Sequence, residues 1–164
     1  QPTSWQSTKR LRRWVGAVMQ NDGLFAGSIR DNITLFDEHA DIFAMERCAV
    51  LAEISDDIAR MPMKYESLVG EQGAGLSAGQ GQRLMLARAL YKQPSFLILD
   101  EFTSNIDEES EARIIANIKQ IGVGVIAIAH RSHVINAADR VYELKEGRLN
   151  ARTERSLCRT SLQA

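Results

Sequence analysis

The sequence predicts an α/β fold with a mostly parallel sheet. Two apolar runs, Phe96–Leu99 and Val123–Ala129, have the length of buried strands. Between them, Ile114, Ile115, Ile118 and Ile121 form one helical stripe. A strand, a helix and a second strand at this spacing form a parallel crossover unit. The length of 164 residues allows one domain with its own core but is short for two.

A first strand is predicted near the start of the chain. The apolar run Val15–Met19 ends at Gln20 and is followed by the turn-forming residues Asn-Asp-Gly. Gln20 therefore stands at the exit of this strand.

A helical subdomain is predicted over residues 41–92. Asp41 is suited to cap a helix, and Ser55 offers a second cap, so residues 41–61 are expected to be helical. Residues 63–75 contain three glycines and no periodicity, which predicts a surface loop.

The next helix begins with Ser77-Ala-Gly-Gln, which fits a capping box between Ser77 and Gln80. The helix should stop before Pro94, because proline cannot continue it. Phe96–Leu99 then has four successive apolar residues, so we expect this strand to be buried on both faces.

Capping and turn-forming residues also predict the elements in the second half of the chain. Asp107 can cap the isoleucine-rich helix and Gly122 can end it. Residues 141–150 read as a small hairpin turning at Glu146-Gly147. The domain should therefore span residues 15–150, between a lead-in segment, 1–14, and a disordered tail, 151–164.

Polar side chains follow both buried strands, at the edge where parallel sheets place ligands. Asp100 could hold a phosphate-bound Mg2+, and Glu101 could polarise an attacking water. His130, after the second strand, would stand beside Glu101 if the strands are neighbours. The alternatives are an ordinary acidic strand end and an ordinary loop histidine.

The turn at Ser77 also has two interpretations. The free N–H groups of the first helical turn and the positive end of the helix dipole could hold a phosphate. The alternative is a simple capping box with glycine for flexibility.

Composition excludes several classes of function. Twenty Lys and Arg balance 21 Asp and Glu, which gives no electrostatic basis for binding nucleic acid. Cys48 and Cys158 match neither a metal-ligand spacing nor a disulfide framework. The most apolar charge-free stretch, residues 120–129, is shorter than the roughly 18 residues that a membrane helix needs.

The order and spacing of these pieces resemble the ATP-binding cassette of an ABC transporter, of the exporter type. The similar segments are the Q-loop VMQNDGLFAGSIRDNI, the signature LSAGQGQR, the Walker B strand FLILDE and the D-loop Ser104–Asp107. The segment MPMKYESLVGEQGAGLS is most similar to bacteriocin, toxin and peptide exporters. The resemblance implies a partial P-loop NTPase fold, α/β with a helical subdomain over residues 41–92 and a partial, mostly parallel sheet.

The resemblance also implies a role for each site residue. Glu101, His130 and Gln20 would be catalytic, with Glu101 as the general base. Asp100 and Gln20 would hold Mg2+. The nucleotide would be contacted by Ser77, Gly79, Gln80 and Asp107. The implied cofactors are ATP and Mg2+, and the implied partners are transmembrane domains and a second cassette, at the cytoplasmic face of the inner membrane.

One motif of the family is absent from this sequence. The phosphate-binding loop, Walker A, needs a Gly-Lys pair, and none of the five lysines follows a glycine. The chain therefore looks like the C-terminal part of a cassette, and we expect it to bind ATP weakly and not to hydrolyse it alone. The alternative is a split or decayed cassette that supplies the signature surface in trans. A DNA-repair ATPase is disfavoured, because neither long heptads nor a basic face appears.

Overall fold

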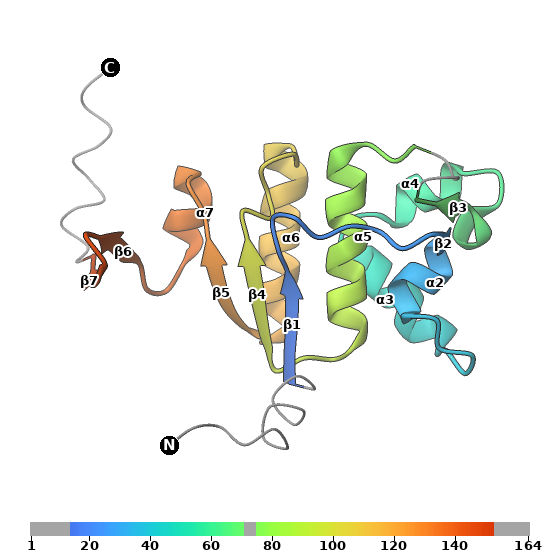
Figure 1. Cartoon of the computed structure of the whole chain (residues 1–164), viewed down its shortest axis with the longest axis horizontal. Helices are drawn as coiled ribbons and strands as arrows, with labels where there is room; N and C mark the ends of the chain where they lie inside the picture. The colour runs from blue at the N-terminus through green and yellow to red at the C-terminus, as the bar shows by residue number, and fades with distance from the viewer. Residues whose placement is uncertain (1–13, 71–74, 153–164) are drawn as a thin grey trace. The chain divides into compact units, whose positions relative to one another are not determined.

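The computed structural model describes residues 14–70 and 75–152 (Figure 1). The chain divides into two compact units, one running to Ile128 and the other beginning at Ala129. Most of the predicted lead-in and tail, and residues 71–74 of the exporter-like segment, lie outside the described residues.

The first unit is built on a parallel sheet of three strands, β1 (Val15–Val18), β4 (Phe96–Asp100) and β5 (Gly124–Ile128). Their order is β1-β4-β5, and both neighbouring pairs are parallel (Figure 1). The predicted strands and their parallel pairing are confirmed.

The two faces of β4 differ in burial. Leu97 and Leu99 are 0% and 7% exposed, whereas Phe96 is 53% exposed. The expectation that this strand is buried on both faces is wrong, because alternate side chains point to opposite faces and the described residues cover only one of them. Pairing on both sides satisfies the backbone of β4 but does not cover its second face.

Two long helices, α5 (Ala78–Tyr91) and α6 (Glu108–Ile121), accompany the sheet (Figure 1). The predicted end of α6 is confirmed, since Gly122 has the left-handed φ of 70°. Helix α5 lies so close to β1 that a Cβ on Gly16 would be 2.9 Å from the carbonyl oxygen of Ala89. The absence of a side chain at Gly16 therefore permits the contact.

The helical region contains more elements than the sequence predicts. It comprises β2 (Gly27–Ser28), α2 (Ile29–Thr34), α3 (Ile42–Leu51), α4 (Ser55–Arg60), the 3-10 helix η1 (Lys64–Glu66) and β3 (Leu68–Val69). The predicted surface loop over residues 63–75 is thus wrong in part. It contains η1 and β3, and β3 pairs antiparallel with β2. Such a short strand forms only because the fold brings a distant segment beside it.

One of the two predicted caps in this region is correct. Asp41 caps α3, and its Oδ1 accepts a hydrogen bond from the Ala44 N–H at 3.0 Å. Ser55 is the first residue of α4, not its cap, so that prediction is wrong. The cap position belongs to Ile54, which is 1% exposed and whose N–H donates to the Ala49 carbonyl. The helix therefore begins one residue earlier than a cap at Ser55 would place it.

The second unit contains α7 (Ser132–Ala137) and a hairpin of β6 (Tyr142–Lys145) and β7 (Arg148–Ala151). Glu146 and Gly147 both have positive φ, 52° and 74°, as a tight hairpin turn requires. The predicted hairpin is confirmed. In the part of the chain that the structure describes, no helix is long and apolar enough to cross a membrane.

Candidate functional site

Parallel pairing brings Gln20 and Glu101 together across 81 residues of sequence. Val18 pairs with Leu99, so the segments that follow β1 and β4 leave the same edge of the sheet. The Gln20 Nε2 donates a hydrogen bond of 2.9 Å to the Glu101 Oε2. Glu101 has a φ of 47°, in the left-handed region that non-glycine residues adopt rarely and at some cost.

Asp100 is the last residue of β4 and is partly exposed. Its carboxylate and the Oε1 of Gln20 are hard oxygen donors, which is the ligand type that Mg2+ prefers. Among residues 14–70 and 75–152, no cluster of three or more His, Cys, Asp or Glu side chains could hold a metal ion. One carboxylate and one amide oxygen are the kind of protein ligands that Mg2+ takes when phosphate and water complete its shell.

The capping box at the start of α5 is confirmed. The Ser77 Oγ accepts from the Gln80 N–H at 3.2 Å, and the Gln80 Oε1 accepts from the Ser77 N–H at 2.9 Å. Ser77 is exposed. Because Oγ acts only as an acceptor in this bond, the hydroxyl can still donate to an anion.

The amide nitrogen of the Gln80 side chain also forms a hydrogen bond within the chain. Its Nε2 donates to the Asp57 Oδ1 at 3.0 Å, and Asp57 forms an ion pair with Arg83 at 2.9 Å. Helix α4 thereby supports the turn at the start of α5. Contact of Gln80 with a nucleotide stays a prediction.

Gly79 and Asp107 have structural explanations of their own. A Cβ on Gly79 would lie 2.5 Å from the carbonyl oxygen of Asn105, so only glycine fits there without a shift. Asp107 caps α6 by accepting from the Ser110 N–H at 2.9 Å. This hydrogen bond lowers the pKa of Asp107, so the carboxylate is charged at neutral pH.

Comparison with known proteins decides the family. The family model described as ABC transporter matches residues 1–104. The chain belongs to the ABC transporter family. It is 47% identical over 132 residues to the probable microcin-H47 secretion/processing ATP-binding protein MchF of Escherichia coli, covering 80% of this chain and 19% of that protein. It is 45% identical over 141 residues to the alpha-hemolysin translocation ATP-binding protein HlyB of Proteus vulgaris, covering 85% of this chain and 20% of that protein.

A solved structure agrees with these relatives. A bacterial Atm1-family ABC exporter with ATP bound matches with a TM-score of 0.80 and 36% identity, covering 86% of this chain and 25% of that one. The predicted fold, a partial P-loop ABC cassette, is therefore confirmed, as is the resemblance to bacteriocin and toxin exporters. The chain spans about a fifth of the length of the curated relatives it matches.

The histidine predicted as the family's switch residue lies in the second unit. His130 follows β5 by two residues, and β5 pairs with β4 so that Ile128 is opposite Asp100. The neighbouring strands that the prediction required are thus present. The approach of the His130 imidazole to Glu101 stays a prediction.

Sequence reasoning missed Arg88, which fixes the Q-loop. Its guanidinium donates to the Asn32 carbonyl at 2.9 Å, to the Asn32 Oδ1 at 2.6 Å and to the Gly23 carbonyl at 3.1 Å, and it lies 4.5 Å from the Phe25 ring centre. Burial lowers the pKa of Arg88. A signal was available, because Arg88 follows the fully buried Leu84 by four residues and so shares its helix face.

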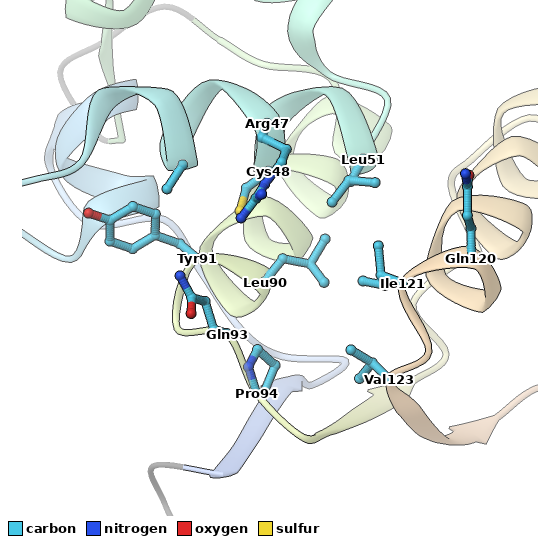
Figure 2. Close-up of a pocket in the computed structure, with 11 residues that line it drawn as sticks. Arg47, Cys48, Leu51, Leu90, Tyr91, Gln93, Pro94, Gln120, Ile121 and Val123 are labelled. Atoms are coloured by element: carbon cyan, nitrogen blue, oxygen red, sulfur yellow. The ribbon is translucent and has the colours of Figure 1, made fainter.

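A cavity of about 540 Å³ lies elsewhere in the first unit (Figure 2). Its walls come from α3, from the C-terminal ends of α5 and α6, and from residues that precede β4 and β5, such as Pro94 and Val123. It therefore lies at the amino ends of the strands. None of the predicted site residues lines it.

Proposed function

We propose that this chain is the C-terminal part of an ATP-binding cassette whose ATP hydrolysis powers export of a peptide, bacteriocin or toxin. The observation that carries the proposal is the hydrogen bond between Gln20 and Glu101 beside Asp100. It joins an amide to the second of two successive carboxylates at the carboxyl edge of a parallel sheet, where such folds bind ligands. The names of MchF and HlyB support the class of cargo.

Within this proposal, Glu101 is the general base that accepts the proton of the attacking water. Gln20 orients the Glu101 carboxylate through their hydrogen bond. His130 orients the water or contacts the terminal phosphate. Asp100 and the Oε1 of Gln20 hold Mg2+, which neutralises phosphate charge when bound.

The start of α5 faces a second cassette. Ser77 and the N–H groups of the first helical turn, including that of Gly79, donate to the terminal phosphate of a nucleotide held by that partner. Gln80 and Asp107 complete this nucleotide-facing surface. Transmembrane domains are the other partners, which places the complex at the cytoplasmic face of the inner membrane.

The isolated chain should not turn over ATP. A backbone cradle and a lysine supply most phosphate contacts in P-loop proteins, and this sequence contains no Gly-Lys pair. The same observation supports a second candidate, a non-catalytic cassette that supplies the signature in trans. Recovery of ATPase activity when the chain is mixed with a complete cassette lacking its own signature serine would support that candidate.

The experiment that tests the main proposal is ATPase activity of the complete transporter that carries this chain. Glu101→Gln should lower kcat at least about 100-fold, because the amide cannot accept the proton. The matched control is Glu38→Gln, at an exposed turn residue, which should leave kcat unchanged. Equal activity of wild type and Glu101→Gln would contradict the proposed role.

A further inference from the structure

One side chain of α5 holds two successive residues of the D-loop. The Oε1 of Gln82 accepts a hydrogen bond from the Asn105 N–H at 3.2 Å. The Nε2 of the same amide donates to the Ser104 Oγ at 3.1 Å. Both polar atoms of the Gln82 side-chain amide thus form hydrogen bonds with this loop.

A second, independent contact lies one turn earlier on the same helix face. The space for a Cβ on Gly79 is filled by the Asn105 carbonyl oxygen, 2.5 Å from the ideal Cβ position. Gln82 follows Gly79 by three residues, so the two are neighbours on the helix surface. The N–H of Asn105 therefore binds Gln82, while its carbonyl oxygen packs on Gly79. Asn105 is fixed from both sides of its backbone.

The D-loop transmits this restraint to Glu101. The Ser104 N–H donates to the Glu101 carbonyl at 3.2 Å, which closes a tight turn. Phe102 and Ile106, each 3% exposed, anchor the two sides of the turn in the core. The Glu101 N–H donates to the Ile128 carbonyl at 3.0 Å, so the strand end is held as well.

We propose that Gln82 is a positioning residue for ATP hydrolysis. By clamping Ser104 and Asn105 on α5, it fixes the orientation of Glu101 relative to the turn that carries Ser77. This inference rests on the proposed function, under which Glu101 and Ser77 act on two different nucleotides. Gln82 touches neither nucleotide and acts through the D-loop.

The test uses the complete transporter with Gln82→Ala, Ser104→Ala, the double variant and Gln82→Glu. Gln82→Ala should lower kcat about three- to tenfold, the effect of one or two hydrogen bonds, and leave the KM for ATP within about twofold. The double variant should be slower by less than the product of the two single effects, because both changes break the Gln82–Ser104 hydrogen bond. Ser104→Ala alone also removes the hydrogen bond from the Asn105 Nδ2 at 3.2 Å. Gln82→Glu keeps the acceptor for the Asn105 N–H and should regain part of kcat.

Hydrogen exchange gives a readout that does not depend on activity. The Asn105 amide should exchange about three- to tenfold faster in Gln82→Ala and return toward the wild-type rate in Gln82→Glu. Gln120→Ala, at an exposed glutamine near the end of α6, should change neither readout.

The results distinguish a failure of the proposed role of Gln82 from a failure of the proposed function of the chain. Unchanged Asn105 exchange in Gln82→Ala would overturn the clamp, whatever the activity. Faster exchange with unchanged kcat would overturn the positioning role, since the contact would then be structural only. An inactive wild-type transporter would contradict the proposed function while the exchange data still decide the clamp.

Discussion

The helical region and strand β5 bury their isoleucine side chains to very different extents. In the helical region, residues such as Ile33, Ile54 and Ile58 are 0% or 1% exposed. In β5, Ile126 and Ile128 are 62% and 53% exposed. Both segments are rich in isoleucine, so composition does not explain the difference. The difference lies in how many helices and strands, among the described residues, pack against each segment.

Most of the buried core lies in the helical region, whereas the catalytic candidates Gln20 and Glu101 follow the ends of strands. Buried side chains from α2, α3, α4 and α5 all contribute to the core, whereas β5 contributes none of the buried core residues in the described part of the chain and forms one margin of the three-stranded sheet. Glu101 and Asp100 lie on or beside this sheet, at the ends of its strands. The signature turn is supported from the helical side through the contact of Gln80 with Asp57. Helix α5 belongs to both regions and joins them.

The largest expected effect comes from the same substitution made in each region. Ile33→Ala should lower the free energy of unfolding by about 2 to 5 kcal/mol, because it leaves a cavity in a closed core. Ile126→Ala should change it by less than about 0.5 kcal/mol, because that side chain is mostly exposed. Urea unfolding of both variants measures the difference, and equal losses would remove the contrast between the regions.

A smaller effect is expected where α5 meets the D-loop. Gly79→Ala should lower the free energy of unfolding by about 1 to 3 kcal/mol, because its Cβ would overlap the Asn105 carbonyl. Gly81→Ala is the matched control, since no atom lies within 4 Å of the added Cβ. That variant should gain up to about 1 kcal/mol from helix propensity. Thermal unfolding distinguishes the two, and a stabilised Gly79→Ala would show that the loop can move aside.

The smallest effect tests a cap inside the helical region. Hydrogen bonding to Ser28, through its side chain and then its backbone N–H, holds the pKa of Asp31 below its ordinary value of 3.8. A lowered pKa in the folded state stabilises the protein above the unfolded value, and this stability is lost as pH falls through the folded value. Asp31→Asn should therefore cost about 0.5 to 1 kcal/mol near neutral pH and progressively less below pH 3.8. Denaturant unfolding at several pH values measures this, and a gap that widens on acidification would reverse the assignment.

Much of the fold follows from local patterns in the sequence. Apolar runs predicted β1, β4 and β5, cap residues predicted the start of α5 and both ends of α6, and Pro94 predicted where α5 stops. These signals work because helix caps and strand lengths depend on neighbouring residues. The helix α2 was missed although Ser28 and Asp31 form a capping box, a signal that the short helix made easy to overlook.

The candidate site was predicted in its residue types but not in its contacts. Motif order identified Gln20, Glu101 and Ser77 and the family to which the chain belongs. Nothing local to the sequence indicated that Gln20 donates to Glu101, that Gln82 holds Asn105 or that Arg88 fixes the Q-loop.

The sequence by itself therefore determined the family, the parallel strands and the residues available for chemistry. Only the tertiary structure decided which face of β4 is covered, where α4 begins, and which polar side chains meet. The physical reason is the distance along the sequence over which each interaction acts. Periodicity and capping act over a few residues, whereas the contact between Gln20 and Glu101 joins groups 81 residues apart and exists only once the sheet has formed.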